Sequence, residues 1–190
     1  MDKSTLITKL SLKYGFILGA VLIVISLTLY FIDPFMLYTN FAMPFIILIV
    51  FIALLVFSGI NIRKEIGGYW TFGEAFKSFL IIALILSITS VLYNVVLMKF
   101  IDPDLPAKAA AAIEDSQRAM MEKFGMASEQ IDEAMTKAGN MEEKLAPTLK
   151  NSFTSFGVSI AMYAVLGLIL AAILKKKEPV TFNTLPQQEA

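Results

Sequence analysis

Four long apolar runs without Asp, Glu, Lys or Arg constrain the fold of this chain more than any other feature. They are Tyr14–Ile32, Pro34–Ile62, Ser78–Met98 and Asn151–Leu174. Because about 20 apolar residues cross the hydrocarbon core of a bilayer as a helix, each run is long enough to span a membrane. Barrel strands would alternate polar and apolar residues, whereas these runs are almost unbroken. The sequence therefore predicts an all-α fold, an integral membrane four-helix bundle.

The composition supports this class and excludes most catalytic chemistry. The chain is 57% hydrophobic and 17% charged, whereas soluble domains are about a quarter charged. It has no cysteine and no histidine, which removes thiol nucleophiles, histidine bases and the usual zinc, copper and haem ligands. We expect a protein that is not an enzyme, has no catalytic residue, cofactor or metal site, and has membrane lipids rather than nucleic acid as partners.

The basic residues predict the orientation. One set of segments carries nine of them, namely Lys3, Lys9, Lys13, Arg63, Lys64, Lys77, Lys175, Lys176 and Lys177. Short loops rich in Lys and Arg stay in the cytoplasm, while long loops are exported with little regard to charge. Both termini are therefore predicted to be cytoplasmic in an inner (cytoplasmic) membrane. The first run is longer than a signal-peptide core of about 7 to 15 residues, so we expect it to remain as an anchor.

These patterns divide the chain into eight segments. We predict a cytoplasmic amino terminus at 1–13, transmembrane helices at 14–32, 41–62, 78–98 and 156–174, a cytoplasmic loop at 63–77, an extracytoplasmic helical loop at 99–155, and a cytoplasmic tail at 175–190.

The 63–77 loop contains two structural signals. Gly67 and Gly68 permit the left-handed backbone that ends a helix, and Thr71 with Glu74 three residues later is typical of a capping box. A helix is therefore predicted to start near Phe72.

Two functional interpretations of the same loop stay open. Trp70 is expected to anchor the helix end at the lipid headgroups. Alternatively, Arg63, Lys64 and Lys77 form a site for an anionic headgroup or phosphate beside a helix amino terminus.

The loop also carries a family resemblance. A basic residue closes the second span, Gly67-Gly68 follows, and an aromatic-Gly-Glu-Ala-Phe stretch at 72–76 enters the third span; a long helical insertion precedes the fourth. Together these features resemble an uncharacterised bacterial membrane family, domain of unknown function 4199, seen mainly in the Bacteroidetes. The resemblance covers roughly residues 9–178. It implies an inner-membrane protein without assigned activity and offers no functional residues to transfer.

The 99–155 loop is predicted to contain two or three short helices. Prolines 103 and 106 end the third span, residues 107–124 are rich in helix formers, Ser128 is expected to cap a helix through Ala138, and Asn140 to cap another. The helices are amphipathic, so their apolar faces either pack together, lie on the membrane or bind a partner. The candidate partner face is Ile113, Met120, Met121, Phe124, Ile131 and Met135.

Inside the spans the sequence offers polar and small residues but no charge. Ser87, Ser90 and Asn94 share one face of the third span, where they either join helices or line a cleft for a headgroup or neutral ligand, with Asn94 the best candidate. Gly15 and Gly19 and the small residues of the fourth span favour close packing between those two spans, or a homodimer.

Three functions follow, in order of preference. The first is a non-enzymatic accessory or scaffold protein whose extracytoplasmic loop binds an envelope protein or a second copy. The second is a component that binds or transports a lipid or small amphiphile. An enzyme is the least favoured, because its only paired outer carboxylates, Asp102 and Asp104, are more simply a solvated helix stop.

Overall fold

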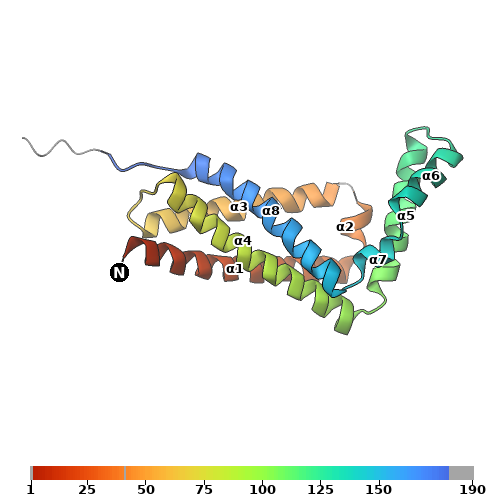
Figure 1. Ribbon diagram of the computed structural model, residues 1–190, viewed down its shortest axis with the longest axis horizontal. Helices are drawn as coiled ribbons and strands as arrows, with labels where there is room; N and C mark the ends of the chain where they lie inside the picture. The colour runs from red at the N-terminus through yellow and green to blue at the C-terminus, as the bar shows by residue number, and fades with distance from the viewer. Residues whose placement is uncertain (1, 41, 180–190) are drawn as a thin grey trace, which may run out of the picture.

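Four long helices lie side by side in this protein and a short helical arm crosses one end of them (Figure 1). The fold is taken from a computed structural model that describes residues 2–40 and 42–179. The long helices are α1 (Lys3–Ile32), α3 (Ala42–Glu65), α4 (Phe72–Val96) and α8 (Leu149–Leu174). All four are long and apolar enough to cross a membrane, α4 together with the π-helical turn η1 (Leu97–Ile101). The predicted all-α bundle with four spans is confirmed.

The helices extend beyond the predicted spans at several ends. Helix α1 begins at Lys3 rather than at residue 14, and α8 begins at Leu149 rather than at 156. The first difference arises because the prediction counted only uncharged residues, although Lys can continue a helix into water. The second arises because the prediction assigned the uncharged residues 151–155 to the loop, although Thr148 caps a helix that includes them. The predicted loop 63–77 shortens accordingly, since α4 already starts at Phe72. Of the predicted tail 175–190, residues 180–190 lie outside the described residues.

Helix α4 is the centre of the bundle, with α1 and α8 packed along it. Gly15 and Gly19 of α1 lie where an added Cβ would come within 3.1 Å of Ile85 and Thr89 of α4. The predicted contact between the first span (α1) and the fourth span (α8) is therefore wrong. The small residues of α1 pack on the third span, α4, instead. Gly167 of α8 likewise packs on α4, so one central helix supplies both seams.

The bundle has two ends of different construction. At the terminal end, where α1 begins and α8 ends, residues 66–71 join α3 to α4; both glycines of this loop have positive φ, and the predicted Thr71–Glu74 capping box is present. At the arm end, α2 (Met36–Thr39) follows α1, and three helices follow η1. These are α5 (Leu105–Lys123), α6 (Ser128–Ala138) and α7 (Met141–Leu145), which we call the arm.

The arm confirms the predicted helices, with one correction. Ser128 is the first residue of α6 and not its cap, which is Ala127. Asn140 caps α7 through a hydrogen bond from the backbone N–H of Glu143, as predicted. The arm is fastened to the bundle because Asp102 accepts a hydrogen bond from the Tyr30 hydroxyl at 3.1 Å and pairs with Lys108 at 3.5 Å. Figure 1 shows α5 running across the ends of the spans rather than along them.

Candidate functional site

The terminal end is held by hydrogen bonds to the last carbonyl of α8. The Leu174 carbonyl accepts one bond from the Trp70 indole N–H at 2.8 Å and another from the Arg63 guanidinium at 2.9 Å. The backbones of Trp70 and Lys176 exchange two further bonds, at 3.0 and 3.1 Å. Helix carbonyls at a carboxyl end have no partner within their own helix, so these donors stabilise the end of α8 and fix the 66–71 loop against it.

This arrangement changes the interpretation of the basic loop. The Trp70 side chain is 1% exposed, so its ring contacts protein and not lipid headgroups, in contrast to the predicted anchor. The Arg63 guanidinium already donates to the Leu174 carbonyl, and the Lys77 ammonium donates to the Ser4 hydroxyl at 2.8 Å. Lys64 is exposed and makes no ion pair or hydrogen bond within the described chain. The structure therefore gives Arg63 and Trp70 a structural role, and a headgroup site at Lys64 and Lys77 stays a prediction.

Hydroxyl groups at the terminal end are also paired with protein. The Ser11 and Ser78 hydroxyls lie 2.7 Å apart with both residues fully buried, which joins α1 to α4. Ser58 donates to the Leu54 carbonyl in its own helix at 2.9 Å. Thr71 and Glu74 bond to each other's backbone N–H groups. At this end of the bundle, these groups all have protein partners for their hydrogen bonds.

At the arm end, α3 separates from its neighbours. The buried residues of α3 begin at Phe51, and no residue from 42 to 50, which we call its first half, is buried. Ile46 and Ile49 are 50% and 68% exposed. In a bilayer, apolar residues such as these would face lipid at little cost, whereas the second half of α3 packs on protein.

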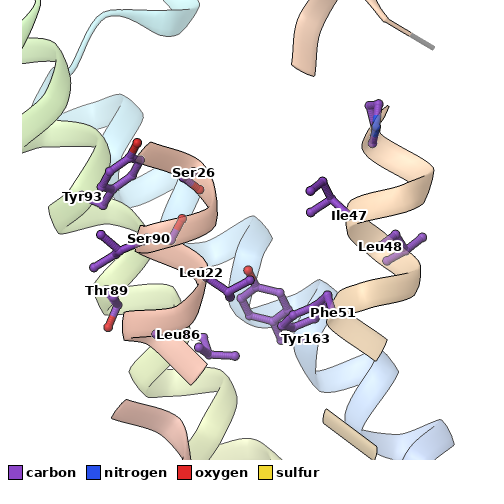
Figure 2. A pocket seen from close by; sticks show the side chains of 13 residues that line it. Leu22, Ser26, Ile47, Leu48, Phe51, Leu86, Thr89, Ser90, Tyr93 and Tyr163 are labelled. Carbon is purple, nitrogen blue, oxygen red and sulfur yellow. The ribbon is translucent and has the colours of Figure 1, made fainter. Parts of the chain in front are cut away.

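The separation of α3 leaves a cavity of about 320 Å³ among α1, α3, α4 and α8. Figure 2 shows Ile47, Leu48 and Phe51 of α3 on one side of it and α1 and α4 on the other. Its thirteen lining residues are Gly19, Leu22, Ile23, Ser26, Pro44, Ile47, Leu48, Phe51, Leu86, Thr89, Ser90, Tyr93 and Tyr163. Ligand pockets occupy about 300 to 1,000 Å³ and are mainly apolar with a few polar groups, which this cavity matches.

The polar groups of the cavity are all hydroxyls. They belong to Ser26, Thr89, Ser90, Tyr93 and Tyr163, and none of these hydroxyls has a hydrogen bond to protein within residues 2–40 and 42–179. The neighbouring Ser87 hydroxyl is fully buried and also has no partner. A buried hydroxyl without a partner costs about 1 to 3 kcal/mol, which applies to Ser87; the five hydroxyl-bearing residues of the cavity lining are half-buried.

The predicted polar face of the third span lies here. Ser90 lines the cavity, and Ser90 and Asn94 together line two smaller pockets closer to the arm, of about 160 and 200 Å³. The Asn94 amide donates to the Ser90 carbonyl at 2.9 Å, which leaves its side-chain oxygen free to accept. Sequence reasoning found this face from its helical spacing. It missed Ser26, Tyr93 and Tyr163 as partners of the face, because only the tertiary packing brings them together.

The arm presents only part of its predicted partner face. Ile131 is 2% exposed and packed within the arm, so it is unavailable to a partner. Ile113, Met121 and Met135 are half-buried, while Met120 and Phe124 are 44% and 80% exposed. These residues are less exposed than predicted because α6 packs on α5, supported by an Arg118–Asp132 ion pair at 2.8 Å.

Comparison with protein families identifies the chain. A family model described as a protein of unknown function, DUF4199, matches residues 13–176. The chain belongs to the DUF4199 family. The match includes all thirteen cavity residues and the whole arm, so both candidate sites lie within the DUF4199 region. Comparisons with curated proteins and with solved structures gave no match.

Proposed function

We propose that this DUF4199 protein is a non-enzymatic, multi-pass membrane protein that binds a lipid or similar amphiphile in the arm-end cavity. The observation that carries the proposal is the cavity among four apolar helices, bounded on one side by the unpacked first half of α3. Because no residue from 42 to 50 is buried, a molecule from the bilayer could reach the cavity laterally past this part of α3. A component that transports such a molecule would use the same cavity.

The depth of the cavity supports a bilayer ligand. Ser26 lies six residues before the end of α1 at Ile32 and Gly19 thirteen residues before it. With a rise of about 1.5 Å per residue, the cavity begins about 9 Å and ends about 20 Å below that helix end. A hydrocarbon core is about 30 Å thick, so the ligand would lie beside acyl chains around the middle of the bilayer.

Photo-crosslinking tests this proposal on two neighbouring residues of α3. Ile47 lines the cavity, whereas Ile49 is 68% exposed outside it. A photoreactive benzoylphenylalanine at residue 47 should capture one defined lipid species from cell membranes, and the same group at residue 49 should capture lipids in proportion to their abundance. The same abundance-weighted lipid mixture at both residues would contradict a specific cavity ligand.

A second candidate function, binding of an envelope protein or a second copy by the arm, is favoured by the turn between α5 and α6. Phe124 is 80% exposed there, beside Met120 and Met126 at 44% and 37%. Methionine-rich surfaces adapt to different partners, and a large exposed aromatic is a typical anchor of a protein interface. Replacing all three by Ser should abolish a cross-linked partner while leaving the bundle intact. A partner list that survives would count against the arm.

We propose that both termini are cytoplasmic and that the arm lies outside an inner membrane. The basic residues at 63, 64, 77 and 175–177 gather at the terminal end, which agrees with retention of that end in the cytoplasm. Single cysteines in this cysteine-free chain provide the test. An impermeant maleimide should label intact cells at Ser116→Cys and Thr136→Cys and not at Ser4→Cys or Gln188→Cys. The reverse pattern would refute the orientation.

A further inference from the structure

We infer that the cavity selects an amphiphile with an uncharged head that carries hydrogen-bonding oxygens, and that the hydroxyls of Ser26, Ser90 and Tyr93 hold this head. The inference rests on the proposed binding function and names the ligand class of the same cavity.

The absence of charge in the lining sets the first property of the head. None of the thirteen lining residues is charged. Of the two smaller pockets, one includes Asp33, whose carboxylate already accepts the backbone N–H of Phe35 at 2.8 Å, and the other includes Lys144 nearer the arm. A phosphate or ammonium head placed in the cavity would lose its water without gaining a countercharge, which is strongly unfavourable in a low-dielectric site.

The unpaired hydroxyls set the second property. A Ser or Thr inside a helix commonly bonds to the carbonyl four residues earlier, as Ser11, Thr28 and Ser58 do in this bundle. Ser26 and Ser90 make no such bond, and Tyr93 donates to no group in the described chain. These hydroxyls are therefore free to donate to ligand oxygens, or to accept from a ligand hydroxyl.

The positions of the hydroxyl groups in the cavity lining determine which way the ligand is oriented. Ser26, Ser90 and Tyr93 line both the cavity and the adjoining pocket of about 200 Å³ nearer the arm, so they stand at the junction of the two. Figure 2 shows them together at one end of the cavity, with Phe51 and Tyr163 toward the other.

The far end of the cavity is apolar and aromatic. The rings of Phe51 and Tyr163 lie 5.3 Å apart, with Leu86 also in the lining. The head therefore sits at the junction with the adjoining pocket and the hydrocarbon tail extends toward this aromatic pair.

Two kinds of bilayer molecule share this chemistry. A neutral glycerolipid presents ester and hydroxyl oxygens, and an isoprenoid quinone presents two carbonyl oxygens on an uncharged ring. Both place a hydrogen-bonding head on a hydrocarbon tail. The experiment separates these two sources from charged lipids and from plain hydrocarbon.

Native mass spectrometry of the full chain in detergent, with four probes at equal concentration, tests the inference. The probes are dioleoylglycerol, dioleoyl phosphatidic acid, menaquinone with a four-isoprene tail, and heptadecane. We expect retention of dioleoylglycerol or of menaquinone about tenfold above heptadecane, which makes no hydrogen bonds, and above phosphatidic acid, whose phosphate would lose its hydration without gaining a countercharge. Preference for the first assigns a glycerolipid, and preference for the second an isoprenoid quinone.

Variants locate the head. Ser90→Ala with Tyr93→Phe should lower retention of the preferred probe about tenfold and leave heptadecane unchanged. Ser26→Ala provides an independent variant on another helix, and Thr28→Val is its control because that hydroxyl bonds to the Val24 carbonyl.

The outcomes distinguish this inference from the proposed function. Stronger retention of phosphatidic acid, or equal retention of all four probes, would overturn the uncharged, hydrogen-bonded head while leaving a ligand cavity. Retention of none of the probes above the level of a cavity-filling Leu22→Trp variant would overturn both.

Discussion

The two ends of the bundle differ in whether their hydroxyl groups form hydrogen bonds with the protein. At the terminal end, the buried hydroxyls of Ser11 and Ser78 bond to each other and the Leu174 carbonyl takes two side-chain donors. At the arm end, the hydroxyls of Ser26 and Ser90 face a cavity and bond to no protein group in the described chain. The same four helices form both ends of the bundle. The two ends differ in how closely α3 approaches the other three helices.

This difference separates stability from binding. In a bilayer the association of helices depends on close packing and on hydrogen bonds between them, and both are concentrated at the terminal end. An end that is already fastened allows α3 to stay apart at the other end without loss of the fold. Substitutions at the terminal end should therefore change stability, and substitutions in the cavity should change ligand retention.

The largest effect is expected from Trp70→Ala. Truncating this fully buried ring removes its packing on Phe79, at 6.1 Å between ring centroids, and its bond to Leu174. The cost should be about 3 to 5 kcal/mol, measured as a lower melting temperature in detergent. Ile49→Ala on the lipid-exposed half of α3 is the control and should change the melting temperature little. Equal losses in the two variants would remove the contrast between the ends.

Two glycines of α8 sharpen the comparison within one helix. An added Cβ at Gly167 would lie 2.9 Å from the Phe79 Cβ, whereas one at Gly157, nearer the arm, would meet nothing within 4 Å. Gly167→Ala should destabilise the fold by about 1 to 3 kcal/mol through overpacking. Gly157→Ala should be neutral or stabilise the helix by up to about 1 kcal/mol. Chemical or thermal unfolding of the two variants side by side measures the difference, and a loss of stability in Gly157→Ala would show that α8 packs closely along its whole length.

Removing a hydroxyl should matter for stability only at the terminal end. Ser78→Ala deletes the bond to Ser11 between α1 and α4 and should cost about 1 kcal/mol. Ser26→Ala deletes a hydroxyl that has no protein partner, so the melting temperature of the ligand-free protein should not fall. A double-mutant cycle with Ser11→Ala gives the energy of the Ser11–Ser78 bond alone. A larger loss in Ser26→Ala than in Ser78→Ala would contradict the account.

The smallest effects are expected at the helix caps. Thr71→Ala removes an acceptor from a complete capping box and should cost about 0.5 to 1 kcal/mol, softened by interfacial water. Thr148→Ala at the arm end removes a single bond, to the backbone N–H of Asn151, and should cost less. Thermal unfolding compares the two. An unchanged melting temperature in Thr71→Ala and Glu74→Gln, together with a lost cellular phenotype, would make this loop a functional site.

The sequence predicts the parts of this fold that depend on local chemistry. The four spans, the Gly67-Gly68 turn, the Thr71–Glu74 box and the arm helices follow from apolar runs, backbone preferences and capping residues within a few positions of each other. The partner of a helix does not follow in this way. Gly15 and Gly19 signal a close contact, but Ile85 and Thr89 on the other side of it are ordinary residues of α4.

The candidate site shows the same division. Helical spacing on one span identifies Ser90 and Asn94, but Ser26 and Tyr163 join them only because three further helices meet there. Trp70 illustrates the reverse error. A tryptophan near the end of a span usually lies at the headgroups, and here the carboxyl end of α8, more than a hundred residues later, covers it.

Fluorescence quenching by brominated lipid tests the central claim most directly. Trp70 is the only tryptophan of the chain and is 1% exposed, so it serves as the probe of the terminal end. Leu48→Trp in a Trp70→Phe background places the probe in the cavity lining, and Ile49→Trp in the same background faces the bilayer.

With increasing concentration of the preferred probe, dioleoylglycerol or menaquinone, brominated on its hydrocarbon tail, the account predicts saturable quenching at residue 48, a gradual unsaturated decrease at residue 49 and almost none at Trp70. Indistinguishable quenching curves at residues 48 and 49, or strong quenching of Trp70, would contradict a bundle that is closed at one end and holds an amphiphile at the other.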